Sequence, residues 1–143
     1  MFSVRTVALI VALQCFVPAS SPLAQQRTPD VIVEAVMTRS LLERAAFHAC
    51  APLEPNPKES IELVVRTWRA DIKDTAEFLL KAGYPKEYVG QLIARLDLQK
   101  ATPRFPDRAA LQAYCAILGD WFRRLSILQY SVPQFDLKRA LKR

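Results

Sequence analysis

The side chains best suited to bind a metal or attack a substrate are few in this sequence: three cysteines and one histidine in 143 residues. His48 and Cys50 lie two positions apart, which suggests a metal site completed by Cys115. In a helix, however, positions i and i+2 point about 160° away from each other, so these two side chains cannot chelate one ion. No Cys-x-x-Cys pair, the usual signature of a thiol oxidoreductase, occurs. We therefore expect no metal, no cofactor and no redox-active dithiol.

Acid–base catalysis has equally little support. His48 would have to serve any Ser-His-acid triad, but no Gly-x-Ser-x-Gly turn is present. On a helical wheel His48 falls opposite Cys50 and beside Arg44, which predicts an exposed surface histidine. Several carboxylates have a helical i,i+4 partner, whereas Glu34, Glu43 and Asp97 lack an obvious one. The expected pairs are Glu62 with Arg66, Glu77 with Lys81, and Asp120 with Arg124. We assign no catalytic residue.

The N-terminal 24 residues have the three parts of an export signal. A short positive segment, residues 1–5, precedes twelve largely apolar residues, 6–17, and a stretch rich in small residues, 18–24. The apolar run is shorter than the roughly 20 residues that cross a bilayer, so we expect cleavage rather than a membrane anchor. Cleavage after Ala24 and cleavage after Ala19 are both compatible with the sequence, and Gln14 before Cys15 argues against a lipoprotein. Removing 24 of the 143 residues leaves 119, the size of a single domain over residues 25–143.

Cys15 leaves with the signal, so the mature chain keeps Cys50 and Cys115. A pair of cysteines in an oxidising compartment predicts a disulfide. Closing a loop of this length stabilises a fold by up to about 4 kcal/mol in the chain-entropy model.

The elements that must position these residues are helices, because ten prolines and only three glycines indicate long helices separated by proline-marked connectors. The expected fold is all-α: an irregular four-helix bundle plus a short C-terminal helix. Each predicted helix has an apolar face spaced for helical geometry. The expected ranges are 28–50, with Val31, Ala35, Leu42, Ala46 and Ala49 facing the core; 56–82, closed by Gly83; 85–96; 106–128, which contains Gly119, Ile117 and Trp121; and 133–143.

Excess positive charge is confined to the last forty residues, where eight Lys or Arg face three Asp or Glu. Four of these basic residues lie within six positions: Lys138, Arg139, Lys142 and Arg143. They form a possible contact patch, beside Leu137, Ala140 and Leu141. Nucleic acid is a poor partner for an exported protein, whereas an envelope protein or an anionic surface fits the compartment.

The sequence therefore predicts a small exported protein, periplasmic or secreted, with no transmembrane segment after signal cleavage. Its expected role is non-enzymatic interaction with a partner. The first alternative is a carrier of a small apolar ligand, with a pocket lined by Trp68, Leu92 and Trp121. The second is an enzyme that uses dispersed acidic residues.

Overall fold

The computed structural model describes residues 22–142, with side chains from Asp30 onward, so the predicted signal falls almost wholly outside the described part. The described chain forms seven α-helices and one 3-10 turn and contains no strand, which confirms the all-α prediction. Their bounds are α1 (Pro22–Cys50), η1 (Ala51–Leu53), α2 (Pro57–Lys81), α3 (Lys86–Arg95), α4 (Leu98–Ala101), α5 (Arg108–Ala116), α6 (Trp121–Ser126) and α7 (Val132–Ala140). None of these helices is long and apolar enough to cross a membrane.

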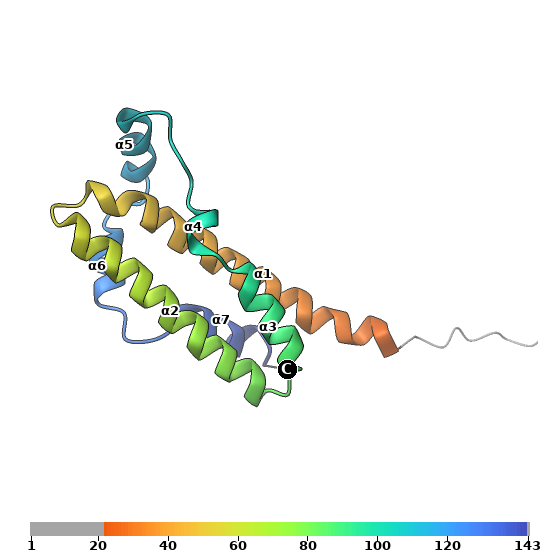
Figure 1. The fold of residues 1–143 in the computed structure, drawn as a ribbon. Coiled ribbons are helices and arrows are strands. Elements are labelled where there is room, and N and C mark those ends of the chain that lie inside the picture. Colours follow the sequence, from red (N-terminus) through yellow and green to blue (C-terminus); the bar gives the residue numbers. More distant parts are fainter. Residues whose placement is uncertain (1–21, 143) are drawn as a thin grey trace, which may run out of the picture.

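Two long helices, α1 and α2, form an antiparallel hairpin closed by η1 (Figure 1). Helix α7 packs on both of them, α3 packs on α2, and α4 packs on α1. The C-terminal helix therefore completes the core. The architecture is a helical hairpin covered by shorter helices.

The signals that bound α2 and α3 are the ones expected from the sequence. Helix α2 begins at Pro57, where a missing N–H costs nothing in the first turn. Asn56 occupies the N-cap position without a side-chain cap bond, and the Ser60 hydroxyl donates to the Asn56 carbonyl at 2.9 Å instead. Gly83 has a φ of +90°, a left-handed conformation that glycine adopts without strain. Helix α3 follows directly from Pro85.

The prediction for α1 was wrong in two respects. The helix begins at Pro22 rather than near Thr28. Its buried face is also rotated: the predicted core residues Val31 and Leu42 are 65% and 59% exposed, and Ala35 is exposed too. The buried face consists of Val33, Met37, Ser40, Leu41, Arg44, Ala45, Ala46, Phe47, Ala49 and Cys50. The buried face includes a serine and an arginine. A prediction from hydropathy alone therefore favours the other face of α1, which is more uniformly apolar.

The predicted long helix over residues 106–128 is also wrong, because the chain divides there into α5 and α6. Gly119 has a φ of +58°, a conformation that ends a helix, and nothing lies within 4 Å of where its Cβ would stand. Gly119 is therefore required for its left-handed backbone conformation and not to make room for a neighbouring helix. Ile117, expected on the apolar face of the predicted helix, is 83% exposed, whereas Trp121 is buried as predicted.

The disulfide prediction is confirmed. Cys50, the last residue of α1, is bonded to Cys115 in α5, with 5.6 Å between the Cα atoms. The short C-terminal helix is also confirmed: α7 begins at Val132, where the Ser131 hydroxyl accepts from the Gln134 amide at 3.4 Å.

Candidate functional site

A groove of about 430 Å³ opens where the end of α2 and the end of α7 meet the first half of α1, and we call it the C-terminal groove. Its lining residues are Ile32, Phe78, Ala82, Tyr84, Lys138, Ala140, Leu141 and Lys142. The volume falls in the range that proteins use to hold small ligands.

Half of the predicted basic patch reaches this groove. Lys138 and Lys142 line it and are exposed. Arg139 does not line it; its guanidinium lies 6.0 Å from the centre of the Phe135 ring. Arg143 lies outside the described residues. The structure therefore brings two of the four predicted cations together.

Those two lysines stand where the α7 backbone favours positive charge. The helix ends at Ala140, so Lys138 lies in its last turn and Lys142 beyond it. Lys138 and Lys142, although four positions apart, are therefore not an i,i+4 pair within one helix. Carbonyl groups left unpaired at a helix C-terminus carry partial negative charge, which offsets repulsion between nearby cations.

The remainder of the groove is largely apolar. Ile32, Phe78 and Leu141 are half-buried, and Phe78 and Leu141 pack against the main core. Tyr84 stacks on Tyr88 with 5.6 Å between ring centroids, which fixes one wall. Burial and then the Asp30 carboxylate raise the pKa of the Tyr84 hydroxyl, so this wall stays neutral at physiological pH. An apolar floor with two cations on its rim matches a ligand that is itself apolar with an anionic end.

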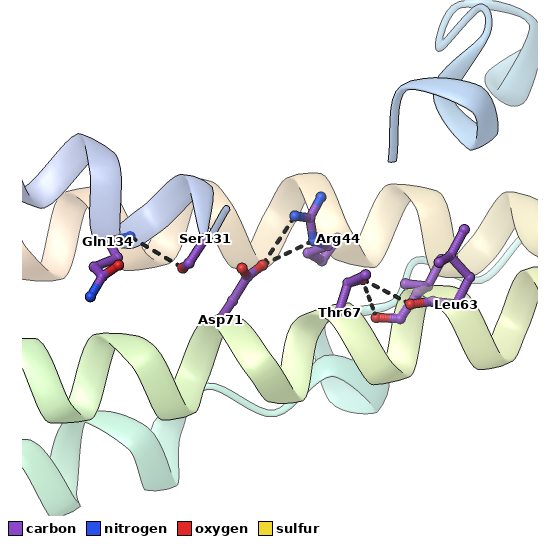
Figure 2. Close-up of polar contacts among 7 residues, drawn as sticks. Arg44, Leu63, Thr67, Asp71, Ser131 and Gln134 are labelled. Atoms are coloured by element: carbon purple, nitrogen blue, oxygen red, sulfur yellow. Dashed lines mark hydrogen bonds and ion pairs between the residues drawn. The ribbon is translucent and has the colours of Figure 1, made fainter. Parts of the chain in front are cut away.

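The one buried ion pair of the described residues joins the long helices. Arg44 on α1 donates to a carboxylate oxygen of Asp71 on α2 from Nε at 3.2 Å and from Nη2 at 3.0 Å (Figure 2). Burial raises the pKa of Asp71, while Arg44 and the hydroxyl of Ser131 act against that rise. This pair was not predicted, because the helical wheel puts Arg44 beside His48, on the side expected to face solvent.

This polar cluster has a structural role. Figure 2 shows Ser131 at the start of α7 beside Asp71, and Thr67 turned back to donate to its own helix backbone. A cavity of about 220 Å³ adjoins the pair and is also lined by Asp74 and Tyr130. Two nitrogens of Arg44 donate to the same Asp71 oxygen, Oδ2, and hold the carboxylate in the ion pair.

His48 is half-buried, not exposed as predicted. Its Nδ1 lies 3.0 Å from the Thr102 hydroxyl oxygen, and that hydroxyl donates to the Leu98 carbonyl at 2.6 Å. The Thr102 oxygen is therefore the acceptor and Nδ1 carries the hydrogen. Burial lowers the pKa of His48. Residues 22–142 contain no group of three or more histidine, cysteine or acidic side chains that could hold a metal.

The three residues expected to line a carrier pocket, Trp68, Leu92 and Trp121, are buried in the core. Trp68 also lines a surface depression of about 320 Å³, together with Ile72 and Ile93. The walls of the C-terminal groove come from other residues, which share no sequence pattern.

Several acidic residues have partners other than those expected. Asp120 contacts Arg123 at 3.9 Å, while Arg124 donates to the Leu118 carbonyl at 2.8 Å. The acids without an expected partner also have roles: Glu34 pairs with Arg95 at 3.1 Å, and Asp97 caps α4 by accepting from the Lys100 amide at 3.1 Å. These contacts lie within the fold and assemble no acid pair.

Comparison of the chain with protein-family models, with curated proteins and with solved structures found no match.

Proposed function

We propose that this chain is an exported, non-enzymatic binding protein that attaches to anionic lipid through the C-terminal groove. The observation that carries the proposal is the placement of Lys138 and Lys142 on the rim of an apolar groove of about 430 Å³. An acyl chain would lie along Ile32, Phe78 and Leu141, and the lysines would contact the charged head group. This binding mode uses every chemical feature of the groove.

Two features support the proposed compartment. Residues 1–24 have the pattern of an export signal. The disulfide between Cys50 and Cys115 suits the oxidising conditions outside the cytoplasm. In that setting lipid head groups are the abundant anions, and each basic residue near a charged membrane contributes about 1 kcal/mol to binding.

Vesicle co-sedimentation tests the proposal on the mature protein, residues 25–143. Vesicles that contain anionic lipid should bind the protein at low salt and release it near 0.5 M, where the Debye length falls to roughly 4 Å. Neutral vesicles should bind it weakly. The double variant K138E/K142E should lose most of the binding. Point substitutions are preferable to deletion of residues 138–143, because Leu141 packs against the core.

The matched control is K58E/R66E, which makes the same charge change on exposed residues in the first half of α2, away from the groove. A general attraction of a basic protein to anionic vesicles would weaken equally in both variants. Loss confined to K138E/K142E supports the groove as the site. Equal loss in the two variants, or full binding by K138E/K142E, would refute it.

A substitution that leaves charge unchanged tests the apolar part. Ala140 is exposed and lines the groove, so Ala140→Trp should fill part of the space without disturbing the core. Binding of a soluble anionic amphiphile such as a fatty acid, measured by calorimetry, should weaken. Unchanged affinity would show that the groove volume is not used.

A further inference from the structure

Helix α1 carries a second apolar face that nothing in the described chain covers. Val31, Ala35, Thr38 and Leu42 are all exposed, and the first and last of them are 65% and 59% exposed. Their spacing of four, three and four residues is the d-a-d-a repeat of a coiled coil. A shallow hollow of about 480 Å³ runs along these same side chains. Three residues of this α1 seam, Val31, Ala35 and Leu42, were predicted to face the core; of that predicted set only Ala46 and Ala49 are buried.

The seam is flanked by one charge of each sign. Glu34 and Arg39 complete the lining of the hollow and fall at the g and e positions of the repeat. Glu34 pairs with Arg95 of α3, and Arg39 pairs with Asp136 of α7. These contacts hold the two side chains beside the seam. Both remain substantially exposed, at 46% and 68%, so each can take a second partner of opposite charge.

We propose that the α1 seam binds a second copy of this chain, with the two α1 helices parallel and related by a two-fold axis. In a parallel pair a g residue meets the e residue five positions later on the partner helix. Glu34 and Arg39 are five positions apart, so each copy offers the acid and the base that the other requires. The arrangement forms two ion pairs, which is the self-complementarity that an isologous interface needs.

The antiparallel alternative fits less well. Antiparallel helices pair g with g and e with e, so placing Val31 opposite Leu42 would put Glu34 beside Leu41 and Arg39 beside Ile32. Neither charge would then meet its opposite. The charges therefore select the parallel orientation, and they do so without reference to any ligand.

The interface is small. The seam spans about 17 Å at 1.5 Å per residue, which is short for a coiled coil. We expect weak, reversible association, with a Kd on the order of 10⁻⁴ M.

A parallel pair has one consequence that depends on the proposed function. Ile32, next to Val31 of the seam, lines the C-terminal groove. A parallel dimer would therefore place both grooves at the same end, where two weak lipid contacts act together. An antiparallel dimer would place them at opposite ends.

Charge reversal tests the register by analytical ultracentrifugation. E34R places two arginines against each other in its homodimer, and R39E places two glutamates, so each variant alone should be monomeric. In an equimolar mixture every pair is again opposite in sign, and the dimer should return. Circular dichroism and an intact disulfide would show that each variant is folded. Failure of the mixture to associate, while the wild type dimerises, would overturn the proposed register.

Cross-linking tests the orientation. In a parallel dimer Thr38 faces Thr38 of the partner, so T38C should form an intermolecular disulfide. The antiparallel pairing described above brings Ala35 opposite Thr38, so a mixture of A35C and T38C would then form the heterodimer preferentially. E43C, exposed on the same helix outside the hollow, is the control.

Equal cross-linking of T38C and E43C, or a monomeric wild type at about 10⁻⁴ M, would refute the dimer. Neither result would bear on whether K138E/K142E loses lipid binding. The two proposals can therefore fail independently.

Discussion

Arg44 and Asp71 show how much of this fold depends on one contact that hydropathy conceals. Their side chains are 5% and 6% exposed, and they link α1 to α2. Removing one partner of a buried pair leaves a charge without compensation, which typically costs 3 to 5 kcal/mol, about the magnitude of several surface pairs combined. The pair therefore specifies how the hairpin closes.

Arg44→Met should destabilise the protein by about 3 to 5 kcal/mol in chemical denaturation. Because burial already raises the pKa of Asp71, and Arg44 opposes that rise, the variant's carboxyl should titrate at still higher pH. A raised pKa means that the folded state binds the proton more tightly than the unfolded state does. Protonation of Asp71 therefore contributes its full stability below the ordinary pKa of 3.8, and this contribution is lost as the pH rises through the raised pKa of the variant. The penalty should accordingly shrink in acid.

The control is Asp120→Asn, which removes an exposed pair with Arg123 and should cost less than about 1 kcal/mol. The double variant R44M/D71L should recover most of the lost stability, since it leaves no buried charge. A cost below about 1 kcal/mol for R44M would mean that water reaches Asp71.

His48 can be observed directly because it is the only histidine in the chain. Burial lowers its pKa, so a proton-detected titration of the ring should give a midpoint below 6.5 in the folded protein. A lowered pKa means that the unfolded state binds the proton more tightly. Stability from this residue is therefore complete above 6.5 and is lost as the pH falls through the folded pKa.

Thr102→Val should remove the acceptor of the His48 Nδ1 hydrogen and lower the melting temperature, while His48→Asn should flatten the pH dependence in the window just below 6.5. A midpoint at or above 6.5 would contradict the half-buried position of the ring.

At the scale of elements, the sequence was informative where a break was marked by proline or glycine. Helices α2, α3 and α7 begin next to Pro57, Pro85 and Pro133, as expected. It failed where two apolar faces competed. In α1 both the buried face and the seam are periodic. The face that contains Ser40 and Arg44 is the core, where Asp71 of α2 pairs with Arg44.

The single helix predicted over residues 106–128, across Gly119, is the second wrong prediction at this scale. A glycine inside an amphipathic pattern is compatible with an uninterrupted helix, and local sequence does not reveal its left-handed backbone. The two interpretations predict opposite effects for Gly119→Ala. In a helix interior alanine would stabilise by about 1 kcal/mol. At a φ of +58° it should instead destabilise by about 1 to 2 kcal/mol. Thermal melts of the variant decide between them, with Gly90→Ala in the middle of α3 as the helical control.

The groove was predictable only in part. Four basic residues in one segment indicated where charge gathers, and two of them, Lys138 and Lys142, line the site. Its apolar walls come from Ile32, Phe78 and Tyr84, which lie far apart in sequence. No local pattern relates these residues, because only the packing of α7 onto the hairpin brings them together.

At the scale of the whole molecule, α5 is the part held least by packing. It has no buried residue, and Figure 1 shows it standing away from the long helices. Its attachments include contacts with α1, the packing of Tyr114 against the core, and the disulfide between Cys115 and Cys50. Cys50 itself is buried in the core, so the covalent bond fixes an exposed helix to the buried end of α1.

This arrangement predicts a graded response when the disulfide is removed. In the double variant C50A/C115A, hydrogen exchange should rise first and most in residues 108–116, because few noncovalent contacts remain to hold α5. Helices α1, α2 and α7 should stay protected from exchange, because they pack on one another and α5 packs only against α1 among them. Global stability should also fall, by up to about 4 kcal/mol, because the unfolded chain regains the freedom of a loop of more than sixty residues. Protection of α5 equal to that of α2 in the variant would show that noncovalent packing holds it. The oxidised protein with its disulfide intact, exchanged in parallel, is the reference. Its α5 amides should exchange more slowly than those of C50A/C115A, by the factor that corresponds to local opening of α5.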